Sequence, residues 1–214
     1  MGKGVIFDMD GVIIDSEPIN QRAVDVVLEQ YGKRLTDEQN QHLIGLGDKP
    51  FFEEIIRMFG LQTTWQALAM SWHDAIIHLM QKEGIAPIDG VRDVIHSLHQ
   101  KKYRLAVASS GSRRRVGFIL KALDLQGYFS SVITADDVMH AKPDPEIYLT
   151  AAARLNLAPQ DCVAIEDSDR GVEAAKRAGV KVIGFLNPNS YNQQLNGADA
   201  IIHSFNEWRD ELLH

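Results

Sequence analysis

Short apolar runs alternate with helical patterns over most of the chain. Five runs have the length and composition of buried strands, and each ends in polar residues: 5–7, 104–108, 132–135, 162–165 and 181–185. Helical spacing occurs in residues 91–98, 116–125, 146–155 and 172–178. Alternation of this kind indicates βαβ units. We therefore expect an α/β fold, a Rossmann-like parallel sheet with helices on both faces.

Residues 16–86 interrupt this alternation, because four helical patterns follow one another there without a strand between them. Thr36 to Gln39 match a capping box, and Gly60 closes the run before it. The sequence thus predicts an all-helical cap domain inserted after the first strand. We expect the catalytic core to comprise residues 1–15 and 87–214 and the cap residues 16–86, with hinges near Asp15 and Ala86.

Composition and charge narrow the class of function. The 214 residues are 45% hydrophobic and 24% charged, which is typical of a folded globular protein. The net charge is −7, from 22 basic and 29 acidic residues. Such a chain offers no broad positive field to a polyanion, so we expect no nucleic-acid partner.

The cysteine content and the hydropathy of the chain indicate where in the cell the protein is expected. Cys162 is the single cysteine, so neither an intrachain disulfide nor a cage of thiolates around zinc is available. No apolar run approaches the roughly 20 residues that span a bilayer, and residues 1–4 lead into the first strand without a signal-peptide pattern. We expect a cytoplasmic protein with no membrane partner. The sequence leaves the oligomeric state open, with a monomer favoured.

Polar side chains at the ends of the predicted strands are expected to form one site, since ligands bind at the carboxyl edge of an open parallel sheet. The set is Asp8, Asp10, Ser109, Lys142, Glu166 and Asp167. Oxygen ligands of this kind suit Mg²⁺, which can share its coordination shell with a substrate phosphate. Any one of these carboxylates could equally belong to a solvated loop. The whole set indicates a site.

Four segments carry a family resemblance. Residues 7–12 (FDMDGV), 108–110 (ASS), 141–145 (AKPDP) and 165–168 (IEDS) resemble, in order, the four motifs of the haloacid dehalogenase superfamily. The resemblance covers the whole chain, including the helical insertion. It is closest to the β-phosphoglucomutase-like branch of sugar-phosphate phosphatases and mutases.

This resemblance implies catalytic roles for three residues. Asp8 would attack phosphorus as the nucleophile, and Asp10 would protonate the leaving oxygen and later take a proton from water. Lys142 would supply a compensating positive charge; an ordinary surface lysine is the alternative. Phosphate binding would add the hydroxyl of Ser109 and backbone N–H groups of Met9, Asp10 and Ser110.

The resemblance also implies a metal. Mg²⁺ would be held by Asp8, by the backbone carbonyl of Asp10 and by Asp167, with Glu166 as a direct or indirect ligand. The dehalogenases have an aromatic residue at the position of Asp10. A carboxylate there resembles phosphate-ester chemistry instead.

These implications predict a Mg²⁺-dependent phosphatase of small phosphorylated metabolites, with sugar phosphates foremost. One alternative is a β-phosphoglucomutase-type phosphomutase, which returns the phosphoryl group to a sugar. Another is a non-catalytic module that kept the fold, but every catalytic residue type is present at its motif position, which argues against it.

Three further residues are candidates for substrate contact. Related β-phosphoglucomutases carry a His on the first cap helix and an Arg in the next cap loop. The matching positions here read Asn20 and Asp48, with Lys49 beside the latter. The negative charge of Asp48 would repel a bisphosphate intermediate, and Lys49 could compensate only after a one-residue shift. Lys in place of Arg would still lose the bidentate grip on a second phosphate, which favours water as the acceptor. Arg113 is the third candidate, because positive charge at a helix start opposes the helix dipole; a solvated surface position is the equal alternative.

Overall fold

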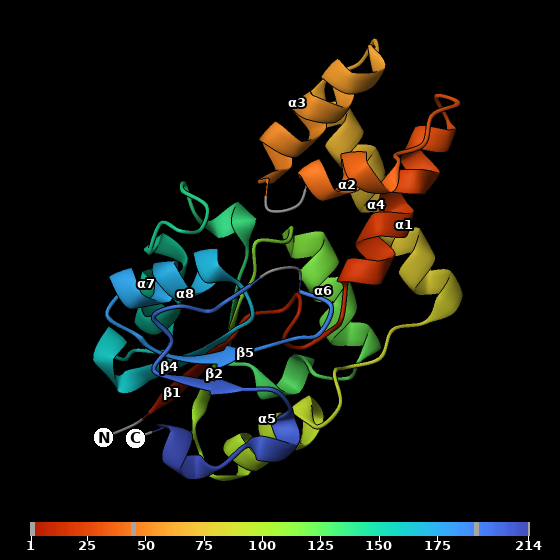
Figure 1. The fold of residues 1–214 in the computed structure, drawn as a ribbon. Coiled ribbons are helices and arrows are strands. Elements are labelled where there is room, and N and C mark those ends of the chain that lie inside the picture. The colour runs from red at the N-terminus through yellow and green to blue at the C-terminus, as the bar shows by residue number, and fades with distance from the viewer. Residues whose placement is uncertain (1–2, 44–45, 191–192, 214) are drawn as a thin grey trace. The chain divides into compact units, whose positions relative to one another are not determined.

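A six-stranded parallel sheet organises the larger part of the computed structural model, which describes residues 3–43, 46–190 and 193–213 (Figure 1). The strands are β1 (Gly4–Phe7), β2 (Arg104–Ala108), β3 (Ser131–Ile133), β4 (Cys162–Glu166), β5 (Lys181–Phe185) and β6 (Ala200–Ile202). Their order is β3-β2-β1-β4-β5-β6, and every neighbouring pair is parallel. The predicted Rossmann-like α/β class is confirmed. The edge strand β6 was not predicted.

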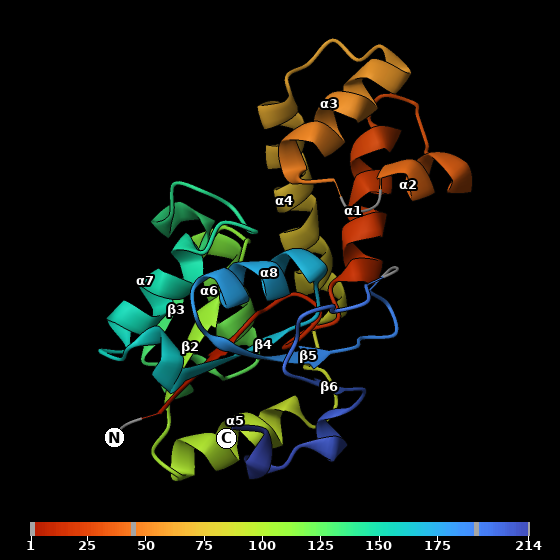
Figure 2. The ribbon, with the colours of Figure 1, turned by 60° about the vertical axis from the view of Figure 1, so that its left-hand side comes forward.

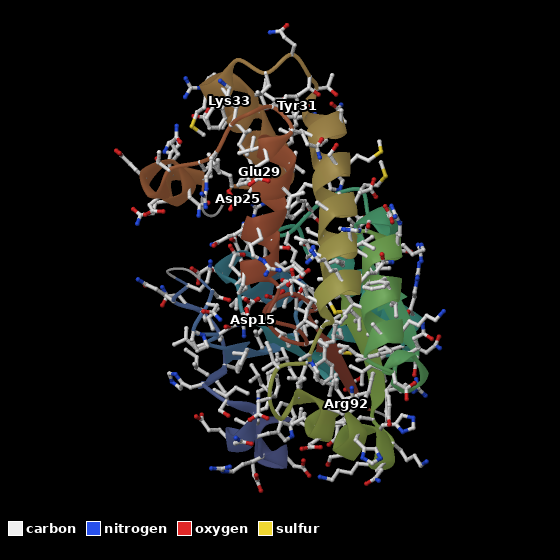
Figure 3. All side chains as sticks on the ribbon, turned by 90° about the vertical axis from the view of Figure 1, so that its right-hand side faces the viewer. Asp15, Asp25, Glu29, Tyr31, Lys33 and Arg92 are labelled. Carbon is white, nitrogen blue, oxygen red and sulfur yellow. The ribbon has the colours of Figure 1, made fainter. Side chains whose placement is uncertain are left out.

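Helices cover both faces of this sheet. The helices of this part are α5 (Val91–Gln100), α6 (Arg113–Ala122), α7 (Glu146–Arg154) and α8 (Asp169–Arg177). Figure 2 shows α5 on one face and α7 with α8 on the other. Small residues on α7 and α8, including Ala151 and Ala174, pack with strand residues such as Ile6 and Ala164 in one buried cluster. Arg92 on α5, labelled in Figure 3, donates to the carbonyl of Leu123 at 2.7 Å and so ties α5 to the end of α6.

Short 3₁₀ segments complete the connections: η1 (Gln126–Tyr128), η2 (Ala135–Asp137), η3 (Pro159–Asp161), η4 (Phe205–Glu207) and η5 (Asp210–Leu213). At η2, Thr134 and Asp137 form a capping box. No helix within the described ranges is both long and apolar enough to cross a membrane.

The chain divides into two compact units, one formed by Met1–Ser16 with Ile85–His214 and the other by Glu17–Gly84. The second unit is entirely helical over its described residues, with α1 (Glu17–Glu29), α2 (Asp37–Leu43), α3 (Asp48–Phe59) and α4 (Trp65–Glu83). Asp25 and Glu29 lie along α1, and Tyr31 and Lys33 follow its end (Figure 3). The use of residues 16–86 as a cap stays a prediction.

Local signals explain where these four helices begin and end. The Thr36 hydroxyl accepts from the N–H of Gln39 at 3.2 Å, and the Gln39 side chain accepts from the N–H of Thr36 at 2.9 Å. This is the capping box that the sequence predicts. The Thr64 side chain caps α4 by accepting from the N–H of Ala67. Gly60 ends α3 with φ 61°, a left-handed conformation that glycine adopts at little cost.

The two segments that flank the helical unit are joined within the sheet unit itself. The N–H of Ile88 donates to the carbonyl of Ile13 at 2.8 Å, and Ile14 and Pro87 form an isolated antiparallel bridge. Ile13 and Ile14 are buried. The chain therefore leaves and re-enters the sheet unit through neighbouring, hydrogen-bonded positions.

Candidate active site

The register of the central strands brings three polar side chains to one edge of the sheet. Phe7 lies opposite Val107 of β2 and Ile165 of β4, so the chain runs on toward the same edge to Asp8, to Ser109 two residues after Val107, and to Glu166, the last residue of β4. The N–H of Asp8 donates to the carbonyl of Ile165 at 3.0 Å. Asp8, Ser109 and Glu166 are all buried. The predicted convergence of these strand ends is therefore present.

Lys142 lies between two of the buried carboxylates. Its Nζ is 2.6 Å from Asp8 Oδ1 and 2.6 Å from Glu166 Oε1, and it also donates to the carbonyl of Ala108 at 3.2 Å. Burial alone would lower the pKa of Lys142, but the charges of Asp8 and Glu166 outweigh it and hold that pKa well above its usual value. Lys142 is 8% exposed, so it is a buried, charged residue rather than an ordinary surface lysine.

Both oxygens of Glu166 accept hydrogen bonds from this chain. Oε1 accepts from Lys142 and from the Tyr148 hydroxyl at 2.5 Å, while Oε2 accepts from the Ser168 N–H at 3.2 Å and hydroxyl at 3.0 Å. A Cβ on Gly171 would lie 1.9 Å from Oε1, so only glycine leaves room for this carboxylate. These partners fix Glu166 against Lys142.

The turn after β1 brings Asp10 and Gly11 against Asp167. A Cβ on Gly11, whose φ is +76°, would lie 1.8 Å from Asp167 Oδ2. The Ser190 hydroxyl donates to the same Asp167 oxygen. Buried Asn187 donates to the carbonyl of Gly11 at 3.1 Å, so the segment after β5 supports this turn from the other side.

Crowding and burial of the carboxylates raise the pKa values of Asp8 and Asp167. Burial raises the pKa of Asp8 well above its ordinary value, and the positive charge of Lys142 only partly opposes this. The negative charges of Glu166, Asp167 and Asp10 raise the same pKa further. Burial and the neighbouring Glu166 raise the pKa of Asp167 to about 7. A buried cluster with more carboxylates than cations fits a divalent cation, which would favour the ionised forms.

The segments after β1 and β2 hold the candidate phosphate-binding groups. Ser109 is fully buried, and its Oγ accepts from the N–H of Gly111 at 3.0 Å. Ser110 is exposed. Met9 is buried, and its carbonyl accepts from the N–H groups of Ile13 and Ile14. The predicted roles of these groups in phosphate binding stay predictions.

Among three consecutive arginines at the start of α6, the structure distinguishes Arg113 from Arg115. Arg113 is exposed and donates from Nη2 to Asp137 Oδ1 at 2.8 Å. Arg115 is buried, and its Nη2 donates to Asp10 Oδ1. The guanidinium that reaches the site is therefore that of Arg115, and substrate contact by Arg113 stays a prediction.

The two remaining substrate candidates lie in the helical unit. Asn20 is on α1, where its carbonyl accepts from the Trp72 indole N–H at 3.0 Å. Lys49 is on α3, exposed, with its Nζ 3.9 Å from Glu53 Oε1. Gly45 and the side chain of Asp48, which belong to the compared cap loop, lie outside the described residues. Substrate contact by Asn20 and Lys49 stays a prediction.

The loop that carries Lys142 is held by Glu146. Its carboxylate accepts from the N–H groups of Met139 at 3.0 Å and His140 at 2.9 Å, which lowers its pKa. His140, Asp144 and Glu146 place possible ligand atoms within 4.8 Å of one another. The hydrogen bonds from Met139 and His140 to Glu146 explain why these three side chains lie close together, because Glu146 caps the N–H groups of this loop. A cavity of about 150 Å³ opens beside this loop, lined by Ser110, Ala135, Val138, Met139, His140, Ala141, Lys142 and Ile147.

Four residues of the site were not found from the sequence: Arg115, Tyr148, Asn187 and Ser190. A signal existed for Arg115, since it precedes Ile119 by one helical turn on the apolar face of α6. Tyr148 shares the apolar face of α7 with Ala151 and Ala152, where a buried hydroxyl requires a partner. Asn187 follows the predicted strand 181–185, which is a strand-end signal, whereas the sequence offers no comparable pattern for Ser190.

Comparison with known proteins gives consistent matches. A family model described as haloacid dehalogenase-like hydrolase matches residues 5–185. A phosphorylated carbohydrates phosphatase of Thermotoga maritima is 35% identical, covering 93% of this chain and 92% of the relative. The β-phosphoglucomutase of Bacillus subtilis is 30% identical, covering 99% and 94%. The crystal structure of CbbY from Rhodobacter sphaeroides in complex with phosphate matches with a TM-score of 0.85 and 27% identity, covering 97% of this chain and 96% of that one.

Proposed function

The chain belongs to the haloacid dehalogenase-like hydrolase family, and from this premise we propose that it hydrolyses phosphate monoesters of small metabolites, sugar phosphates foremost, through an aspartyl phosphate on Asp8. The observation that carries the proposal is the buried position of Asp8 at the end of the central strand, with Oδ1 2.6 Å from Lys142 Nζ. A relative that covers 93% of the chain is a phosphatase of phosphorylated carbohydrates, which supports the substrate class.

In the first step, a carboxylate oxygen of Asp8 forms a bond to phosphorus while the bond from phosphorus to the leaving oxygen breaks. That oxygen takes the proton carried by Asp10. In the second step, water attacks the same phosphorus, its proton passes to Asp10, and the bond between phosphorus and Asp8 breaks. Lys142 offsets negative charge on Asp8 throughout, and the hydroxyl of buried Ser109 would donate to a phosphoryl oxygen.

The oxygen donors at this edge fit Mg²⁺. Asp8, the carbonyl of Asp10 and Asp167 would hold the ion, and Glu166 would act indirectly, because both its oxygens accept bonds from Lys142, Tyr148 and Ser168. Bound Mg²⁺ supplies charge neutralisation at the phosphoryl oxygens. Tyr148 and Ser168 keep Glu166 in place and thereby fix Lys142.

A screen of phosphorylated metabolites with Mg²⁺ present tests the proposal by release of inorganic phosphate. We expect turnover of hexose or pentose phosphates, and a complete absence of phosphate release across the screen would refute a phosphatase.

A sugar phosphomutase is the second candidate, because the mutase of Bacillus subtilis aligns with 99% of the chain. Phosphorus NMR with β-glucose 1-phosphate and a trace of glucose 1,6-bisphosphate distinguishes the two acceptors. Inorganic phosphate as the main product supports the hydrolase, and glucose 6-phosphate supports the mutase. We expect inorganic phosphate, since Asn20 and Asp48, with Lys49 beside the latter, match the positions where the related mutases carry His and Arg.

A further inference from the structure

Arg115 and Asp10 form an ion pair at the edge of the candidate site. Asp10 Oδ1 accepts from Arg115 Nη2, and the two residues are 105 positions apart in sequence. The Arg115 side chain is 5% exposed, whereas that of Asp10 is 30% exposed. The arginine is thus the buried, fixed partner, and the aspartate carries the part that solvent or a substrate can reach.

The position of Arg115 opposes two general preferences. It is the third residue of α6, where the partial positive charge at the helix N-terminus disfavours a cation. A buried guanidinium also requires a compensating anion. Asp10 supplies that anion. Arg114, the preceding residue on the same helical turn, is exposed. An arginine on this turn therefore need not be buried.

The stem of Arg115 also lies against the loop of Ser109. A Cβ on Gly111 would be 3.2 Å from Ser109 Oγ and 3.9 Å from Arg115 Cδ. The Arg115 side chain therefore packs beside the Ser109 loop, which follows β2, and also binds Asp10 in the turn that follows β1.

From this geometry we infer that Arg115 is a positioning residue for Asp10, which rests on the proposed phosphatase reaction. Arg115 occupies Oδ1 and holds the carboxyl group through that oxygen. Oδ2 is then the oxygen that carries the proton to the leaving oxygen and receives the proton from water. The expected result of losing Arg115 is a defect in proton delivery rather than in binding of the phosphate.

The test compares aryl phosphates of graded leaving-group basicity, from p-nitrophenyl phosphate to p-methoxyphenyl phosphate. The p-nitrophenolate ion leaves without a proton, whereas the more basic phenolates need one. Since general acid catalysis contributes roughly 10²- to 10⁴-fold, we expect Arg115→Met to lower kcat/KM for the most basic leaving group by roughly tenfold or more. The p-nitrophenyl ester should change by less than about threefold, so log kcat/KM should fall more steeply with leaving-group pKa.

Three controls separate positioning from a structural role. Arg114→Gln removes an exposed cation from the same helical turn and should leave the slope unchanged. Arg115→Lys should recover part of the loss, because an ammonium group on a shorter side chain can still bind a carboxylate oxygen. In an Asp10→Asn background, Arg115→Met should have no further effect on the slope.

An equal loss for all the aryl phosphates would overturn the inference, since it would show only a structural tie, and so would a gain in activity. Crystal structures of wild type and Arg115→Met add a readout that needs no turnover. We expect the Asp10 side chain to change rotamer in the variant; an unmoved carboxyl group would overturn the inference. A wild-type protein that releases phosphate neither from these esters nor from any metabolite of the screen would instead refute the proposed function.

Discussion

Replacing Gly171 by alanine places a methyl group on top of the Glu166 carboxylate. The new Cβ would lie 1.9 Å from Oε1, 2.0 Å from Cδ and 2.1 Å from Oε2. An ordinary contact begins near 3.4 Å, so the carboxylate and the helix must separate by about 1.5 Å. The bonds from Lys142 at 2.6 Å and Tyr148 at 2.5 Å to Glu166 Oε1 cannot both survive that shift.

The expected loss of stability follows from these contacts. Overpacking of a buried position costs about 1–3 kcal/mol, and a lost hydrogen bond to a charged group costs about 1.5–3 kcal/mol. We expect Gly171→Ala to lower the free energy of unfolding by about 3–5 kcal/mol. Because Lys142 loses its fixed partner beside Asp8, kcat should also fall by roughly 10²-fold, the effect of a misplacement of about 1 Å.

Urea unfolding followed by circular dichroism measures the first effect, and phosphate release at saturating Mg²⁺ measures the second. Gly117→Ala is the matched control, because Gly117 is exposed on α6 and a Cβ there meets nothing within 4 Å. That variant should be more stable than wild type by about 0.5–1 kcal/mol through helix propensity alone. Wild-type stability and kcat in Gly171→Ala would refute the argument.

Three further predictions follow from the site and its surroundings. Asp8→Asn should leave the circular dichroism spectrum unchanged and reduce phosphate release below about 1% of wild type, because an amide cannot act as the nucleophile; substantial turnover would exclude a covalent intermediate on Asp8. EDTA should abolish activity, Mg²⁺ should restore it, and Ca²⁺ should inhibit, since its looser coordination misplaces Asp8 relative to phosphorus; full activity in chelated buffer would contradict this. Burial favours the neutral form of Asp137, yet hydrogen bonds from Arg113, Thr134 and Arg154 hold its pKa well below the usual value. Asp137→Asn should therefore cost about 1–3 kcal/mol near pH 7. Because the pKa of Asp137 is lower in the folded state, the ionised carboxylate stabilises the fold at pH values above its unfolded-state pKa of about 3.9, and this stabilisation is lost as the pH falls toward the folded-state pKa. The difference in urea midpoint between wild type and Asp137→Asn should therefore shrink below about pH 4.

Strands with strong apolar runs could be predicted from the sequence, and weak ones could not. The run from Lys181 to Phe185 is β5 as the structure has it. β6, with only Ala200, Ile201 and Ile202, is short, lies at the sheet edge and buries few side chains, so its apolar signal is weak. Pairing with β5 defines this strand, and pairing is a property of the folded sheet rather than of the segment.

The site shows the same division between local and non-local information. The positions of Asp8, Asp10, Glu166 and Asp167 could be predicted because each lies at the end of a strand or just after it, and parallel strands end at a common edge. Arg115 was missed, because its role depends on which of three successive arginines faces inward. That choice is set by the register of α6, which begins at Arg113 and buries Arg115, Val116 and Ile119.

The hydrogen-bonded closure between Ile13 and Ile88 has a consequence for evolution and engineering. Since the sheet unit brings its own chain ends together at this closure, we expect the intervening segment Glu17–Gly84 to be exchangeable as one continuous piece. A short loop, or the corresponding insertion from a relative, should be tolerated at these two junctions with the strand order unchanged. A lineage of this kind would change by exchanging a single continuous stretch of gene, while the residues around Asp8, where the phosphoryl chemistry is proposed, stay in place.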